Sequence, residues 1–353
     1  MSRKISRSFI NGRAGAGTAG QGIKVEWDST NDGELHWLDV SESSLEAVVD
    51  GDIAVYSGVF NSYVDTMDYI TITSTGNATD FGNMTVGKDS CATTANGGNG
   101  RGLHFMGRLS GGTETNIIEY ITINTPGNAT DFGDCSSATY NASACSNGIN
   151  DRGVVSLGII TDSNDSNVLE YVTISSTGNA TDFGDMTVLC SYGGGTSNGI
   201  NDRGIILRGN STGGGVTFNN HIEYITISST GNSTDFGDLT EAKHGLSGTT
   251  SNGTSDRAVV GGGVNSSAKV NVIEYFTISS TGNATDFGDL SNTHKYVGAA
   301  SNGTGDRAVW SGGFDATVNV MEYVTISSTG NATDFGDSTA SGMSQGVSNA
   351  GGN

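Results

Sequence analysis

Basic residues are scarce in this chain, and cysteines are few. Lys and Arg number 16 against 37 Asp and Glu, a formal net charge of −21. Such a charge repels nucleic acid backbones and anionic membranes, so no nucleic acid partner is expected. The cysteines show no CxxC spacing and are expected to be free thiols in a reducing compartment: Cys91, Cys135, Cys145 and Cys190.

Long apolar runs and helical patterns are also missing. No run approaches the apolar length of a membrane span, and the N-terminal stretch MSRKISRSFINGRAGAG lacks the apolar core of a secretory signal. No segment sustains the 3.6-residue apolar period of an amphipathic helix. Proline occurs once, at Pro126, whereas glycine occurs 55 times among many Thr, Ser and Asn residues. This composition favours strands and turns and predicts an all-β protein.

What the chain does contain is a repeat of about fifty residues. Six copies of a nonapeptide close to TGNATDFGD are spaced by 51, 51, 53, 51 and 48 residues, measured between their phenylalanines: Phe81, Phe132, Phe183, Phe236, Phe287 and Phe335. A block such as IEYITI precedes each copy and supplies the second repeated aromatic residue: Tyr69, Tyr120, Tyr171, Tyr224, Tyr275 and Tyr323. A period of this length is typical of repeat architectures.

Each repeat holds four short β-rich pieces bounded by Gly, Asn, Ser and Asp. In the fifth copy these pieces are 244–251, 256–263, 269–278 and 285–289. Runs of β-branched and aromatic residues between turn residues are typical of strands. Four strands in about fifty residues make one blade of a β-propeller. The sequence therefore predicts an all-β, six-bladed β-propeller with an N-terminal extension.

The order of residues in a repeat resembles the kelch repeat. A glycine pair ends the second strand, a tyrosine lies in the third and an aromatic residue opens the fourth, as at Gly262, Gly263, Tyr275 and Phe287. The chain departs from kelch in having Phe rather than Trp at the last position, and the first three copies lack a clean glycine pair. The strings EYITI and TGNATDFGDLT resemble those of kelch-like repeat proteins of tailed bacteriophages over residues 51–353. That resemblance implies a virion context more than a molecular activity.

The first repeat lacks an evident first strand, and the C-terminus can supply it. GVSN at 346–349 aligns with AASN at 299–302, which ends the first strand of the sixth repeat. A C-terminal strand would then join both chain ends in one sheet and leave no exposed blade edge. The alternative is that residues 33–40 supply this strand, with a seventh, irregular blade.

The chain divides by charge into an arm and a body. Residues 1–24 hold five bases and no acid, and are predicted to be a flexible docking arm: Arg3, Lys4, Arg7, Arg13 and Lys24. Residues 25–50 are predicted to be a connector that packs on the ring, with Trp27 and Trp37 in it. Residues 51–353 form the propeller.

The repeated nonapeptide can be interpreted either as a metal-binding site or as a structural turn. Pairs such as Asp286 and Asp289 offer carboxylates to calcium, but calcium takes six to eight oxygens and DxDxDG spacing is absent. In the structural interpretation, TGNATD is a turn into the fourth strand, with Gly282 and its equivalents at positive φ. The Phe then packs between blades. One Arg per blade, as at Arg203, is expected to pair with a repeat Asp or with the acid before the Tyr. We expect no metal or other cofactor.

Three functions follow, of which the first is favoured. It is a non-enzymatic virion protein, such as a fibre, tail appendage or capsid decoration, whose arm binds other virion proteins. It would form homo-oligomers on the particle and attach to a glycan or protein of the host surface. The second is a free carbohydrate- or protein-binding propeller. The third is a propeller enzyme such as a glycan hydrolase, which needs a non-repeated cluster of acid, Tyr or His on one face. No such cluster can be assembled from the sequence.

Overall fold

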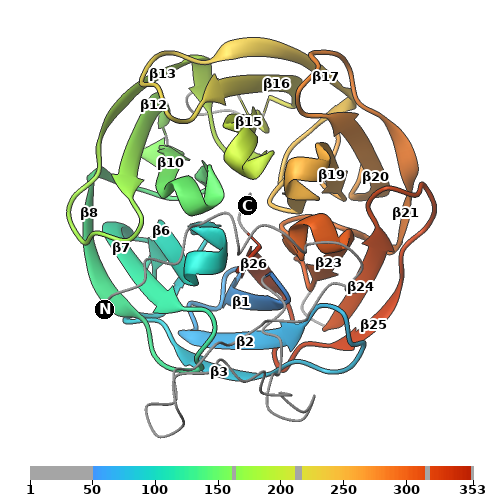
Figure 1. Cartoon of the computed structure of the whole chain (residues 1–353), viewed down its shortest axis with the longest axis horizontal. Coiled ribbons are helices and arrows are strands. Elements are labelled where there is room, and N and C mark those ends of the chain that lie inside the picture. The colour runs from blue at the N-terminus through green and yellow to red at the C-terminus, as the bar shows by residue number, and fades with distance from the viewer. Residues whose placement is uncertain (1–50, 161–163, 211–216, 315–318, 351–353) are drawn as a thin grey trace, which may run out of the picture. The chain divides into compact units, whose positions relative to one another are not determined.

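The computed structural model describes residues 51–160, 164–210, 217–314 and 319–350 (Figure 1). They form six antiparallel blades around a central axis, which confirms the predicted all-β, six-bladed propeller. All six blades belong to one compact unit, Asp50–Asn353. The predicted arm, the connector and both of its tryptophans lie outside the described residues. No helix in the described ranges has the length and apolar character needed to cross a membrane.

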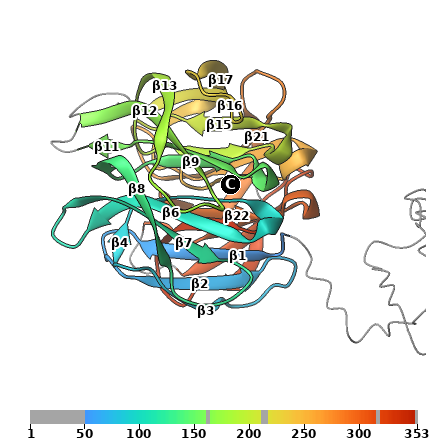
Figure 2. The ribbon, with the colours of Figure 1, turned by 60° about the vertical axis from the view of Figure 1, so that its left-hand side comes forward.

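The blades are named in chain order, with their strands given from the axis outward. Blade 1 contains β26 (Met343–Ser348), β1 (Ile53–Val59), β2 (Thr66–Thr71) and β3 (Thr79–Asn83), of which β1, β2 and β3 lie side by side in both views (Figures 1 and 2). Blade 2 contains β5 (Ala92–Ala95), β6 (Arg101–Leu109), β7 (Glu114–Thr122) and β8 (Thr130–Thr139), with the short β4 (Lys88–Asp89) beside β6. Blade 3 contains β9 (Ser143–Ser146), β10 (Arg152–Ser156), β12 (Asn164–Thr173) and β13 (Thr181–Cys190), with β11 (Ile159–Ile160) beside β12.

The other three blades are more regular. Blade 4 contains β14 (Gly194–Ser197), β15 (Arg203–Leu207), β16 (Asn219–Thr226) and β17 (Thr234–Lys243). Blade 5 contains β18 (Thr249–Ser251), β19 (Arg257–Gly261), β20 (Val270–Thr277) and β21 (Thr285–His294). Blade 6 contains β22 (Gly298–Ser301), β23 (Arg307–Ser311), β24 (Val320–Thr325) and β25 (Thr333–Asp337). In blade 5 the first strand is shorter than expected, because 244–248 forms a loop, and the fourth runs on to His294.

The C-terminal strand closes the ring, as the GVSN alignment predicts. β26 pairs antiparallel with β1, with Val347 opposite Val55. The Asn349 side chain accepts a hydrogen bond from the Ile53 N–H at 2.9 Å. The same bond recurs elsewhere in the ring, for example from the Arg307 N–H to the Asn302 side chain at 2.8 Å. The inner place in blade 1 is therefore filled by the end of the chain, and not by residues 33–40.

Neighbouring inner strands are tied together near the axis by a repeated serine. The Ser197 hydroxyl donates to the Ser146 carbonyl at 2.6 Å, and the Ser251 hydroxyl to the Ser197 carbonyl at 2.6 Å. After each of these inner strands, and likewise after β5 and β22, a single 3-10 turn leads to the second strand. The turns are η3 (Gly97–Asn99), η4 (Gly148–Asn150), η6 (Gly199–Asn201), η7 (Gly253–Ser255) and η8 (Gly303–Gly305).

The six DFG phenylalanines lie in the apolar layers between successive blades, and each is 2–3% exposed. Phe236 packs with Ile222 of its own blade and with Phe276 of the next, whose ring centroid is 5.3 Å away. The tyrosine of each repeat meets the phenylalanine of the same blade edge to face, at 6.3 Å between Tyr224 and Phe236. The repeated aromatic residues are therefore part of the blade-to-blade packing.

We predict that Phe236→Ala destabilises the ring by about 3–5 kcal/mol, the usual cost of truncating a buried Phe. Asp238→Ala is the matched control, because the Asp238 side chain is 38% exposed and pairs only with the half-exposed His221. Thermal unfolding of both variants checks the expectation. Equal and small losses of melting temperature would contradict the packing role and favour the metal reading of the nonapeptide.

The nonapeptide is repeated because its first half binds the second half of the preceding copy. Gly282 and Ala284 of blade 5 donate backbone N–H groups to the carbonyls of Phe236 and Asp238 in blade 4, at 2.9 and 2.8 Å. The Asn283 side chain accepts the Asp238 N–H at 3.1 Å. This asparagine bond occurs at all six blade junctions, through Asn77, Asn128, Asn179, Asn232, Asn283 and Asn331. Each copy must fit both neighbours, so all six carry nearly the same sequence.

Contrary to the prediction, the repeated arginines form no ion pair with an acid within the part of the chain that the structure describes. Arg203 lies over the Tyr224 ring, 4.5 Å from its centroid, and donates to the carbonyls of Ile278 and Ser279 in the next blade at 3.1 and 2.8 Å. The acid before each tyrosine instead accepts an N–H group from the preceding blade, as Glu274 does from Thr240 at 2.6 Å. Backbone groups at the blade junctions would otherwise be left without hydrogen-bond partners. Hydrogen bonding of these groups therefore takes precedence over ion pairing.

Blade 2 contains several buried ionisable groups. Lys88 and Glu119 pair at 3.1 Å with both side chains fully buried. His104, also fully buried, has no hydrogen-bond partner at either ring nitrogen. Burial lowers the pKa of His104 to about 4. The histidine is therefore neutral in the folded protein at neutral pH.

We predict that His104 makes the fold sensitive to acid. Its folded-state pKa lies below the unfolded value of about 6.5, so the unfolded chain takes up the proton first and stability falls as the pH drops from about 6.5 towards 4. The decrease in the free energy of unfolding over this range should be smaller in His104→Leu than in the wild type, in denaturant titrations at pH 7, 6, 5 and 4.5. Parallel profiles would contradict the assignment.

Candidate functional site

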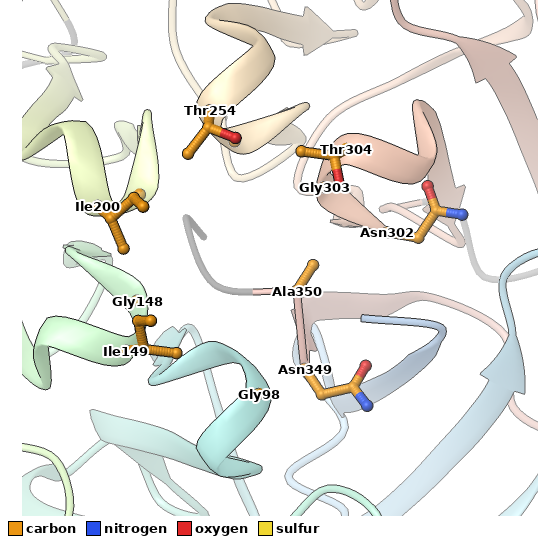
Figure 3. Close-up of a pocket in the computed structure, with 12 residues that line it drawn as sticks. Gly98, Gly148, Ile149, Ile200, Thr254, Asn302, Gly303, Thr304, Asn349 and Ala350 are labelled. Carbon is orange, nitrogen blue, oxygen red and sulfur yellow. The ribbon is translucent and has the colours of Figure 1, made fainter. Parts of the chain in front are cut away.

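The axis opens at two ends that differ in chemistry. At one end, the 3-10 turns surround a cavity of about 220 Å³ (Figure 3). Its lining is glycine-rich and uncharged, with Ile149 and Ile200 58% and 50% exposed. Because similar segments of each repeat form it, this cavity offers backbone groups and apolar, Thr and Asn side chains. Arg152 and Asp202 lie outside it, in a neighbouring hollow that shares Ile200.

At the opposite end, the loops between successive blades form a second ring. The residues that turn the chain there share the left-handed backbone conformation, and include Ser90, Asn141, Tyr192, Gly245 and Tyr296 at φ of 54–74°. The N–H groups of the last four of these residues each donate to the carbonyl of the equivalent residue in the preceding loop, at 2.9–3.1 Å. We call this end the loop mouth.

Side chains at the loop mouth differ from one repeat to the next. The residue just before the turn is in succession Asp89, Tyr140, Ser191, His244 and Lys295. The nonapeptide on the other face is nearly constant by comparison. A catalytic or specific binding site is built from residues in distinct roles, and the five residues at this position are all different.

Aromatic rings gather around Tyr296 at the loop mouth. Phe60 stacks on Tyr296 with 4.3 Å between centroids, and Tyr192 lies 5.9 Å from it. Phe314 meets Phe60 edge to face at 5.1 Å, while His244 lies 6.3 Å from Tyr296. The rings come from blades 1, 4, 5 and 6, so the fold assembles them from segments distant in the sequence.

Arg108 adds a positive charge on the blade 2 side of the mouth. Its guanidinium binds the buried Asp89 carboxylate at 3.1 and 3.3 Å. It also lies over the Tyr140 ring at 5.2 Å and near the Tyr63 ring at 5.7 Å. Asp89 further accepts the Asn61 N–H at 2.7 Å. The Asp89 carboxylate is therefore already bound by groups of this same chain.

The protonation states at the mouth favour hydrogen bonding and stacking. Burial, with the neighbouring Tyr140, raises the pKa of Tyr192 to about 12, and burial raises that of Tyr296 further. Burial, with the nearby Lys295, lowers the pKa of His244 to about 4. At neutral pH the two phenols therefore carry their protons and the imidazole is neutral.

The mouth is a surface site rather than a deep pocket. The cavity beneath it, lined in part by Phe60, Tyr192 and Tyr296, measures about 10 Å³, room for about one water molecule. A ligand would therefore lie across the rings. Within the described ranges, no three His, Cys, Asp or Glu side chains are grouped as metal ligands. The four cysteines are buried and unpaired, and burial raises the pKa of Cys91, Cys145 and Cys190 to about 12.

The loop mouth is the functional feature that sequence reasoning missed. The repeated Tyr and Phe residues singled out from the sequence lie between blades, and the basic residues of the arm lie outside the described residues. The histidines occupy unlike repeat positions, and for that reason they gave no pattern. An alignment of the six loops between DFG and SNG would have located the mouth, because there the repeats stop being alike.

Comparisons with known proteins support the fold alone. No family model matches the sequence, and no curated protein matches it. Among solved structures, that of YjhT superposes with a TM-score of 0.59 at 12% identity, covering 81% of this chain and 95% of that one. At this identity the likeness shows a shared propeller and nothing of activity. The resemblance to kelch-like phage proteins stays a prediction, and the chain is assigned to the β-propeller fold.

Proposed function

We propose that this chain is a non-enzymatic virion protein of a tailed bacteriophage whose propeller attaches the particle to the host surface through the loop mouth. The asymmetric aromatic mouth carries the proposal. The half-buried rings of Phe60 and Tyr192, the latter with a phenol donor, suit a sugar ring or an aromatic peptide side chain. A shallow surface of this kind fits a ligand that is itself part of a large surface.

Binding is favoured over catalysis by the state of the acids at the mouth. Hydrolysis of a glycosidic bond normally uses two carboxyl groups, one on each side of the bond. Asp89 is engaged by Arg108 and by the Asn61 N–H. A second carboxylate, that of the buried Asp165, lies near Tyr192 and is bound by the side chains of Ser191 and Asn210.

The virion context is supported by the sequence. The basic arm, residues 1–24, precedes an acidic body and suits docking on an acidic partner of the particle. The resemblance to phage repeat proteins points the same way. Several copies on one particle would multiply a weak interaction at each mouth through avidity. The alternative, a free carbohydrate- or protein-binding propeller, uses the same mouth but has no need of the arm.

Two measurements test the proposal. A chain lacking residues 1–24 should keep its fold and its binding to host cells, but lose incorporation into particles. Tyr192→Ala in the full chain should reduce binding of labelled protein to host cells about tenfold, as a stacking residue at the centre of an interface does. Ile200→Ala, at the other end of the axis, is the matched control. Normal incorporation of the shortened chain would favour the free propeller, and unchanged cell binding by Tyr192→Ala would exclude the mouth.

A further inference from the structure

Two small cavities adjoin each other on the axis beneath the loop mouth, where the inner strands begin. The upper cavity is the one of about 10 Å³ described above, and the lower one measures about 30 Å³, room for about two water molecules. Residues of all six blades line the lower cavity, from the inner strands or just before them. The two linings share Ala142, Gly193, Ser247 and Gln345.

Three serine hydroxyls that line these cavities have no hydrogen-bond partner in the described part of the chain. Ser90 and Ser143 are only 3% and 4% exposed, and the hydroxyl oxygen of Ser247 is buried as well. A serine further along an inner strand does find a partner, as Ser197 does at the Ser146 carbonyl. Because a buried hydroxyl without a partner is less favourable than an apolar group of the same shape, the three hydroxyls indicate a small ligand between the inner strands.

The groups that remain available in the lining are mainly hydrogen-bond donors. The Gly346 carbonyl already accepts the Thr93 hydroxyl at 2.8 Å. The N–H groups of Ala142 and Gly193, in contrast, donate no hydrogen bond within the described ranges. The buried Gln345 side chain adds an amide group to both linings. No acidic or basic residue of the described chain lines either cavity, so a ligand here is recognised by hydrogen bonds and size.

We propose that the axis binds one halide ion, in ordinary buffers chloride, with the hydroxyls of Ser143 and Ser247 and the amide of Gln345 as donors. A halide accepts hydrogen bonds and donates none, so it suits a lining with spare donors. A chloride ion is only slightly larger than a water molecule and fits the lower cavity, whereas phosphate and sulfate are too large for it. Burial of an anion is costly unless several donors replace its water. These three donors come from blades 3, 5 and 1, so the ion would join three inner strands.

A crystal of the full chain grown in sodium bromide gives the direct test, because bromide scatters anomalously at its absorption edge. We expect an anomalous peak on the axis within hydrogen-bond distance of the Ser143 and Ser247 oxygens, and chloride at the same place in crystals grown in sodium chloride. Water molecules at this place, without an anomalous peak, would overturn the proposal. The site is separate from the surface of the loop mouth, so either result leaves the proposed function untouched.

Thermal unfolding tests the site in solution, with sodium gluconate replacing sodium chloride at constant ionic strength. Gluconate is too large for the cavity. The melting temperature should rise by about 3 °C for each tenfold increase in chloride above its dissociation constant, because a ligand of the folded state stabilises that state. Replacing sodium by potassium or choline at fixed chloride should change nothing. A melting temperature that follows the cation, or that is equal in gluconate and chloride, would contradict a halide site.

The substitution Ser247→Ala places the ion by the sign of its effect. With a halide bound, the variant loses a donor and should bind chloride about tenfold less tightly, the size of a lost hydrogen bond to a charged group. If the hydroxyl has no ligand, the variant should be at least as stable as the wild type, with the same dependence on chloride, and the site would be excluded. Ser229→Ala is the matched control, because Ser229 is exposed in a turn of blade 4 and should keep the wild-type dependence.

Discussion

A chain that ends at residue 339 should not form a stable ring. Removing 340–353 takes away β26, the inner strand of blade 1. Met343 and Val347, both fully buried, would be lost from the layers on either side of that blade. Each such side chain is worth about 1.5–3 kcal/mol, and the lost pairing would leave one edge of β1 without hydrogen-bond partners. An unpaired strand edge invites association with other chains, so the shortened protein should aggregate or unfold at much lower temperature.

A deletion of residues 1–20 is the control for this experiment, since the sequence predicts that segment to be part of the docking arm. Thermal unfolding and size-exclusion chromatography of both chains would compare them. A circular permutant that begins near residue 338 and joins residue 353 to residue 1 should fold, because β26 then stays in the chain. If the C-terminal deletion were harmless and removal of 30–45 unfolded the protein, the closing strand would be the N-terminal one.

The architecture was predictable because it is repeated. Six DFG phenylalanines at nearly constant spacing give six blades, and the GVSN alignment gives the closing strand, since both depend only on local likeness between copies. The contacts at the blade junctions were harder to predict from the sequence. The sequence suggested an acid as the partner of Arg203, whereas the guanidinium binds carbonyls of Ile278 and Ser279. Every residue has a backbone carbonyl, so the sequence does not indicate which carbonyl an arginine binds. Matching opposite charges along the sequence therefore cannot find these hydrogen bonds.

The loop mouth was not predictable from repeat patterns for a related reason. Its residues, such as Tyr192, His244 and Lys295, are those at which the repeat fails, and a search for likeness passes over them. They meet only because the ring brings loops of different blades to one axis. The constant part of the repeat therefore builds the ring, and the variable part supplies its chemistry.

The second large effect is expected from Gly237→Ala, which tests the junction formed by the nonapeptide. Gly237 lies in β17 with φ of 149°, and an added Cβ atom would meet the carbonyl oxygen of Gly282 in the next blade at 2.4 Å. That oxygen belongs to the turn whose N–H groups bind Phe236 and Asp238. The turn would have to move outward, and its hydrogen bonds to blade 4 would lengthen or break.

Gly231→Ala is the matched control, since Gly231 has a similar φ of 157° but no atom within 4 Å of an added Cβ. Both substitutions strain the backbone, and only Gly237→Ala also creates a clash. Overpacking of this kind costs about 1–3 kcal/mol, so Gly237→Ala should be less stable than Gly231→Ala by that amount in denaturant titrations. Because each junction is one of six links in a closed ring, weakening one should lower the stability of the whole unit in a single transition. Equal stabilities of the two variants would show that the close approach of the two nonapeptides does not hold the blades together.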